Sequence, residues 1–128
     1  MSKQVALDAM LQASEHAQTK PPVFLDAWKN GIHLAGTRFF NVDCDSVGQA
    51  TSVDQLRPDL DMVFQVISSL STYEQVFILS MCQFYCDSDV RAYCDKHSLT
   101  VPALPDIANL DDKHRSVIVT LLNSYTGW

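Results

Sequence analysis

STYEQVFILSMCQFYC, residues 71–86, carries the strongest structural signal in the chain. Ser71 and Glu74 have the spacing of a capping box, in which each side chain accepts a backbone N–H at the start of a helix. After this cap, only Ser80 and Gln83 interrupt a continuous apolar run. A surface helix has one apolar stripe, whereas this segment is apolar nearly all round. We therefore predict a helix that is covered on every side, by the rest of the chain or by another copy of it.

Four other stretches show helical periodicity or helix-start signals, namely residues 2–18, 58–70, 88–97 and 111–125. Pro58 suits the first turn of its helix, and residues 100–105 are expected to be a connector. Residues 117–120, Val-Ile-Val-Thr, are β-branched and favour a strand locally, but the longer apolar period favours a helix. The first stretch, 2–18, has one apolar face that consists of Val5, Ala6, Ala9, Met10, Ala13 and Ala17.

The region that follows the first predicted helix has the least regular sequence pattern. Val23–Trp28 is a short apolar piece that we expect to stop at Asn30–Gly31. From about residue 30 to residue 53 there is no helical period, and Thr37–Val42 is expected to be extended. The predicted fold is all-α: one domain over 1–128, a compact bundle of about five helices with the irregular segment 30–53 packed across it.

Composition restricts the classes of partner. The chain has 128 residues, of which 47% are hydrophobic, and a net charge of −6, which suits a single globular domain. An acidic chain without a Lys/Arg cluster disfavours binding to nucleic acids and to anionic membranes. There is no long apolar run typical of a membrane span and no signal-peptide pattern at the start. The four cysteines then read as free thiols, which predicts a cytoplasmic protein.

Two groups of residues contain metal-ligand types, but their spacing argues against a metal. In the first group, Cys82 and Cys86 lie one helical turn apart, followed by Cys94 and His97. Zinc binds such ligands, but this spacing lacks the turn found in zinc knuckles, and buried cysteine also serves as a small core hydrophobe. We favour the core role.

The second group runs from Asp43 to Asp54 and partly matches a calcium loop, with Asp43, Asp45, Gly48 and Asp54 at positions 1, 3, 6 and 12. Val47 stands at position 5, where an oxygen ligand is required, so a solvated loop is the better interpretation. We predict neither a metal nor a cofactor.

Polar residues of the irregular segment are the candidates for ligand binding. His33, Arg38, Asp43 and Asp45 would line a cleft beneath residues 30–53 if the protein is a small enzyme or a ligand-binding protein, possibly one that depends on a divalent metal. Sequence assigns none of them a catalytic role. The remaining candidate, His114, is expected on a solvated first turn of the last helix.

Aromatic residues near the irregular segment and at the C-terminus are the candidates for an interface. Trp28, Phe39, Phe40 and Trp128 are of the type that anchors protein contacts, although aromatics also cover the cores of small bundles. The apolar helix and the lack of a convergent polar group favour a cytoplasmic protein-interaction or regulatory module that self-associates or binds a protein partner. A small enzyme or ligand-binding protein is the alternative.

Overall fold

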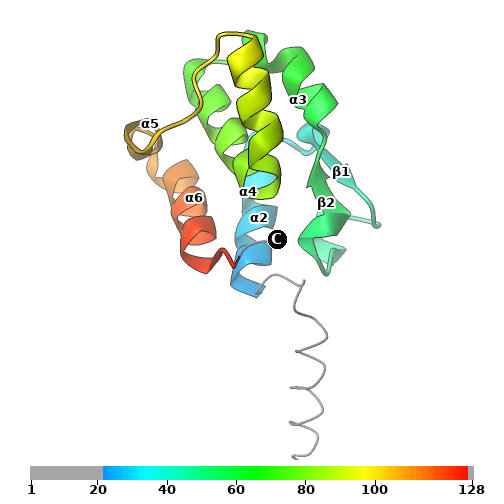
Figure 1. Cartoon of the computed structure of the whole chain (residues 1–128). Coiled ribbons are helices and arrows are strands. Elements are labelled where there is room, and N and C mark those ends of the chain that lie inside the picture. Colours follow the sequence, from blue (N-terminus) through cyan, green and yellow to red (C-terminus); the bar gives the residue numbers. More distant parts are fainter. Residues whose placement is uncertain (1–21, 127–128) are drawn as a thin grey trace, which may run out of the picture.

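The computed structural model describes residues 22–126, and this part of the chain is mostly helical (Figure 1). The predicted all-α class is confirmed, with a two-stranded sheet added to it. The predicted helix over 2–18 and the residue Trp128 lie outside the described residues. The α-helices described are α2 (Pro22–Ala35), α3 (Leu60–Val66), α4 (Thr72–Lys96), α5 (Leu104–Ala108) and α6 (Asp112–Ser124).

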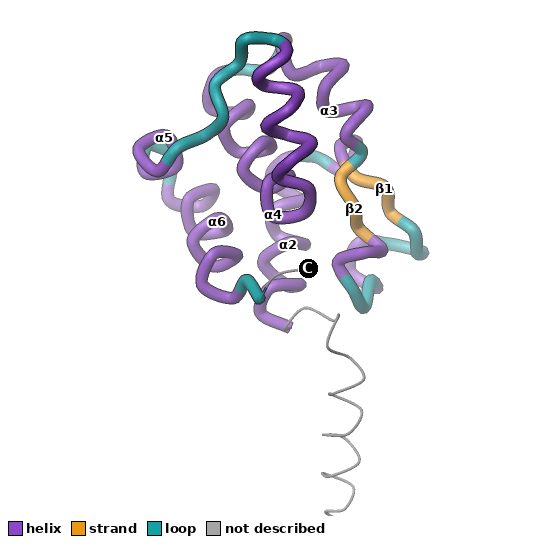
Figure 2. The backbone as a smooth tube through the Cα atoms, viewed as in Figure 1, coloured by secondary structure: helices purple, strands orange, loops and turns teal. Residues whose placement is uncertain are grey.

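Helices α2, α4 and α6 pack together at the centre of the molecule. Figures 1 and 2 show α3 and the small sheet on one side of α2 and α4, with α5 and α6 on the other. Gly31 of α2 makes the close packing possible, because a Cβ at this position would lie 2.5 Å from Met81 Cε and 3.2 Å from Val117 Cγ1. The largest fully buried side chains include Trp28, Phe24 and Ile32 from α2, Ile78 and Met81 from α4, and Leu121 from α6.

The first half of α4 is the covered helix that the sequence predicts. The capping box is formed: Ser71 Oγ accepts from Glu74 N at 3.1 Å, and Glu74 Oε1 accepts from Ser71 N at 2.9 Å. All six residues from Phe77 to Cys82 are buried. The backbone of Cys86 is not helical, with φ −152° and ψ 65°, so a kink separates this half from the second. The helix start expected near Asp87 thus becomes a bend within one long helix.

The boundary expected at Asn30–Gly31 is wrong, because α2 continues through both residues to Ala35. The helix ends instead at Gly36, whose φ of 115° favours glycine. Packing against α4 and α6 accounts for the difference, since a side chain at Gly31 would displace the end of Met81 and crowd Val117.

The irregular segment therefore begins at Gly36 and ends at Pro58, later than predicted at both ends. It contains two short strands, β1 (Phe40–Val42) and β2 (Leu56–Pro58), which pair antiparallel with Phe40 opposite Pro58. Three single 3-10 turns connect these pieces: Thr37–Phe39, Val47–Gln49 and Val53–Gln55.

Apolar anchors and three side-chain hydrogen bonds hold this segment on the helices, one of them from Lys29 Nζ to Gly48 O at 3.1 Å. Val47, Val53 and Leu56 are buried. Trp28 Nε1 donates to Leu56 O at 2.9 Å, and the Tyr85 hydroxyl donates to Asp54 Oδ1 at 2.9 Å. The segment is packed across the bundle, as predicted, and it is better ordered than its sequence pattern indicates.

The remaining connections differ from expectation in detail. Pro58 ends β2 and does not open a helix; Asp59 caps α3, and its Oδ1 accepts from Met62 N at 3.2 Å. The expected connector 100–105 includes the start of the short helix α5. Residues 117–120 are helical within α6, so the apolar period outweighs the local β-branched preference. None of the helices described is long and apolar enough to cross a membrane.

Candidate functional site

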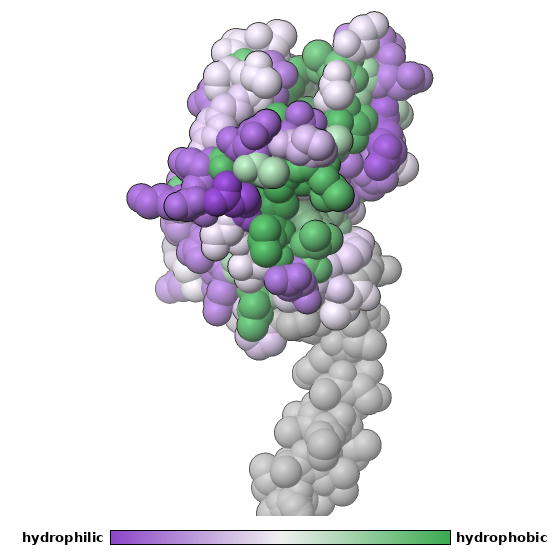
Figure 3. All heavy atoms as spheres, turned by 90° about the vertical axis from the view of Figure 1, so that its left-hand side faces the viewer, coloured by the Kyte–Doolittle hydropathy of each residue, from purple (hydrophilic) through white to green (hydrophobic). Residues whose placement is uncertain are grey.

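An apolar hollow of about 390 Å³ lies between α4, α5 and α6, and we call it the α4–α6 groove. Figure 3 shows apolar side chains gathered on this side of the molecule, around a hollow bordered by polar surface. No residue that lines the groove is charged, and three carry a polar side-chain atom. The lining consists of Ser80, Gln83, Phe84, Pro102, Ala103, Leu104, Ile107, Ile118, Leu122 and Tyr125.

The groove exists because α4 has apolar residues on every face. One face packs into the core against α2, and a neighbouring face with Ser80, Gln83 and Phe84 lines the groove beside α5 and α6. The Phe84 ring also lies 6.0 Å from the Phe24 ring of α2. Ile118 and Leu122 are four residues apart on α6, so they share one face of that helix. The short helix α5 holds Leu104 and Ile107 on the other wall. Because α5 is only five residues long, it covers the face of α4 incompletely.

Large apolar side chains project around the groove into solvent. Leu104 is 75% exposed, Leu122 is 58% exposed and Tyr125 is 40% exposed. Single exposed apolar residues are ordinary, but a cluster of them around a hollow marks a binding surface. At one end the Tyr125 ring lies 5.5 Å from the Phe84 ring and 6.1 Å from the Phe24 ring, which connects the groove to the core.

The wall of the groove contains one buried polar atom that has no hydrogen-bond partner among the described residues, the Oγ of Ser80. The residue is 3% exposed. A buried hydroxyl without a partner costs about 1–3 kcal/mol. A bound molecule that presents a donor or an acceptor to this wall would remove that cost.

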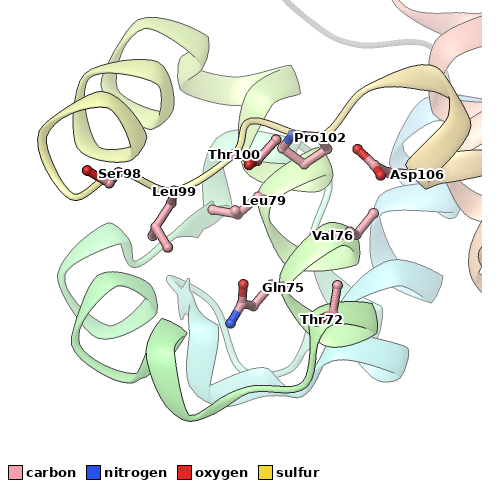
Figure 4. Close-up of a pocket in the computed structure, with 9 residues that line it drawn as sticks. All are labelled: Thr72, Gln75, Val76, Leu79, Ser98, Leu99, Thr100, Pro102 and Asp106. Carbon is pink, nitrogen blue, oxygen red and sulfur yellow. The ribbon is translucent and has the colours of Figure 1, made fainter.

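A second hollow, of about 350 Å³, lies between the start of α4 and the chain that follows it, near Pro102 (Figure 4). Two of its polar side chains, Gln75 and Asp106, already have structural roles. Gln75 Nε2 donates to Ile67 O at 2.9 Å and to Leu70 O at 3.1 Å, and Asp106 Oδ2 accepts from Ala103 N at 2.9 Å. We therefore assign these groups to the corner before α4 and to the start of α5, and not to a ligand.

The group most similar to a catalytic constellation joins the starts of α4 and α6. His114 Nδ1 lies 2.6 Å from the Tyr73 hydroxyl and 2.7 Å from Asp111 Oδ1. The backbone N–H of His114, the Tyr73 hydroxyl and the His114 ring together hold the pKa of Asp111 well below its ordinary value. Burial, and then the bond to Asp111, raises the pKa of Tyr73.

This cluster consists of the Asp111 cap of α6 and its contacts, through the His114 ring, with aromatic residues of α4. Asp111 Oδ1 also accepts from His114 N at 2.9 Å, which is the cap bond of α6. The His114 ring contacts the edges of Tyr73 and Phe77 at centroid distances of 4.9 and 4.6 Å. The expectation of a solvated His114 is therefore wrong: its side chain is 18% exposed, because α4 supplies two aromatic neighbours.

Burial argues against a reactive site at three of the four cysteines. Burial raises the pKa of Cys82, raises that of Cys86 to about 11, and raises that of Cys94. Such thiols stay protonated at neutral pH and are poor nucleophiles and metal ligands. Residues 22–126 hold no group of three or more His, Cys, Asp or Glu side chains placed to bind a metal ion. His97 instead lies over the Tyr93 ring, at 4.2 Å, where α4 ends.

The predicted ligand-binding residues are placed apart from the groove. His33, Asp43 and Asp45 are exposed and line none of the hollows described in this section. Arg38 lies over the Phe39 ring at 4.5 Å and borders a hollow of about 50 Å³ beside Glu74 and His114. A hollow of that size holds a water or two, not an organic substrate.

Three of the predicted interface residues belong to the core of the chain. Trp28 is 0% exposed, and Phe39 and Phe40 are also buried. Trp28 and Phe40 meet edge to face at 5.9 Å. These aromatics therefore attach the irregular segment to the bundle. The fourth residue, Trp128, lies outside the described residues.

The residues that make the groove were not predicted as a site. Leu122 lies within the helix predicted over 111–125, and Leu104 lies in the predicted connector 100–105. The signal that was available is that Val76–Cys86 is apolar nearly all round and therefore needs cover on every side. Comparison of the chain with family models, with curated proteins and with solved structures gives no match.

Proposed function

We propose that this chain is a cytoplasmic protein-interaction module that self-associates through the α4–α6 groove. The observation that carries the proposal is the cluster of Leu104, Leu122 and Tyr125 exposed around an apolar hollow. Covering such a surface removes apolar area from water, which is the main favourable term in protein association. The four cysteines, all of them free, support a reducing compartment.

The chemistry of the groove fits a protein contact better than catalysis. Interface centres are depleted in charged residues, and the lining of this groove has none. Two copies each carry a net charge of −6, so an uncharged contact surface avoids placing like charges opposite each other. Gln75 and Asp106 of the second hollow and the groups of the His114 cluster make hydrogen bonds within the fold. The same net charge supports a protein partner over nucleic acid or an anionic membrane.

A matched pair of substitutions on α6 tests the proposal. Leu122→Glu places a charge in the groove, and Val119→Glu places the same charge on the same helix outside the groove, at a residue that is 43% exposed. We expect Leu122→Glu to raise the dissociation constant of the self-associated form roughly 30-fold or more, because a charge then has to be desolvated on association. Val119→Glu should leave the constant within a few-fold of the unmodified chain.

Sedimentation velocity over a range of concentrations gives these constants. Both side chains are largely in solvent, so both variants should keep the melting temperature and the far-ultraviolet circular dichroism of the parent. Equal effects of the two substitutions would contradict a role for the groove, as would self-association that neither one weakens.

A further inference from the structure

We infer that residues 2–18 of one protomer form the helix that fills the α4–α6 groove of a second protomer. This inference rests on the proposed function and names the element that performs it. It predicts a dimer in which two N-terminal helices are exchanged, each lying against α4, α5 and α6 of the other chain.

The first argument is the match between the shapes of the two surfaces. The groove presents large projecting side chains, Leu104, Leu122 and Tyr125. Residues 2–18 present mainly small ones on the predicted apolar face, which has four alanines besides Val5 and Met10. Knobs pack into the holes between small residues, and small residues let two helices approach closely. As a helix, 17 residues span about 25 Å, which is enough to follow α6 along its whole length.

The second argument is the place where the segment joins the bundle. It precedes α2, which begins at Pro22, and Val23 shares a hollow with Ser124 and Tyr125 at the end of α6. The part of the chain that the structure describes therefore begins beside the Tyr125 end of the groove. Residues 2–18 therefore need no long linker before α2 to reach an α4–α6 groove.

The third argument concerns whose groove it fills. The proposed function is self-association through this groove, so the helix that fills it has to come from a second copy. A helix that lay in the groove of its own chain would cover Leu104, Leu122 and Tyr125 without joining two chains.

The fourth argument is the buried hydroxyl of Ser80. It lines the groove and has no hydrogen-bond partner among the described residues, so the occupant must be able to donate or accept there. Residues 2–18 carry an amide at Gln12 and a hydroxyl at Ser14, which flank the predicted apolar face. A purely apolar ligand would leave the hydroxyl unpaired.

Substitutions in the full chain separate the inference from the proposed function. Met10→Glu with Ala13→Glu places two charges on the predicted apolar face. Gln4→Glu with Gln18→Glu adds the same charge on the opposite side of the helix. We expect the first pair to raise the dissociation constant of the dimer roughly 30-fold or more and the second pair to leave it within a few-fold.

A synthetic peptide of residues 2–18 provides the direct binding measurement. Titrated by calorimetry into the Met10→Glu/Ala13→Glu chain, whose groove is free, it should bind one peptide per chain. Adding Leu122→Glu to that chain should abolish the binding, whereas adding Val119→Glu should not.

Each other result overturns the inference. If the Met10→Glu/Ala13→Glu chain still dimerises while Leu122→Glu does not, the groove mediates association without the N-terminal helix, and the proposed function stands alone. If the unmodified chain is a monomer and the peptide still binds the variant, the helix fills its own groove, and both the exchange and self-association are wrong.

Discussion

At the scale of single residues, polar groups in this protein mostly serve helix ends and corners. Asp111 caps α6 and binds the ring of His114, which in turn contacts Tyr73 of α4. The sequence indicates that Asp111 caps a helix, but it does not indicate the contact between His114 and Tyr73 of α4. Helix signals are local, whereas Tyr73 and His114 are 41 positions apart in the sequence. Ser80 is the exception, since its hydroxyl serves nothing within the described chain.

Asp111 makes the stability of the fold depend on pH. Its pKa is lowered in the folded chain, so it stabilises the fold above the pKa of an unfolded aspartate, about 3.9, and the stabilisation is lost as the pH falls below that value. Asparagine caps helices as well as aspartate but does not ionise. We therefore expect Asp111→Asn to be less stable than the parent at pH 7, with the difference shrinking towards pH 3. Urea unfolding at both pH values checks this, and a difference that does not change with pH would contradict it.

At the scale of elements, close packing decides where helices begin and end. The sequence correctly indicates the covered helix α4, its cap, α6 and a mostly helical fold. It fails at Asn30–Gly31, where a pair typical of a turn lies inside α2. The reason is tertiary: Gly31 faces Met81 and Val117, so glycine is favoured there by neighbours distant in the sequence.

Gly31→Ala tests this packing. Alanine favours a helix by up to about 1 kcal/mol, but its Cβ would lie 2.5 Å from Met81 Cε and 2.6 Å from Met81 Sδ. Overpacking typically costs about 1–3 kcal/mol, so we expect a net loss of stability of about 1 kcal/mol. The control is Gly48→Ala, whose Cβ would meet nothing within 4 Å and which should be neutral or slightly stabilising.

Chemical denaturation of the two variants gives the comparison. Combining Gly31→Ala with Met81→Ala should cost less than the sum of the two single changes, because the new methyl group fills part of the space left by methionine. A Gly31→Ala variant more stable than the parent would show that the approach of α2 to α4 is not close.

At the scale of the whole molecule, the apolar content exceeds what residues 22–126 bury. The core is complete, with Trp28, Phe24 and Leu121 fully covered, yet Leu104, Leu122 and Tyr125 remain exposed around one groove. Sequence indicated that the helix over 71–86 needs cover from this chain or another copy, but it could not place the uncovered face. That face depends on the short length of α5, which periodicity does not predict. Three of the aromatic residues expected at an interface, Trp28, Phe39 and Phe40, lie in the core instead.

The mass of the unmodified chain in solution is the most direct test of self-association through the groove. Sedimentation equilibrium at increasing concentration should show a species of twice the 14.3 kDa of one chain, and the fraction of that species should rise with concentration. A mass of one chain at every concentration would contradict the account.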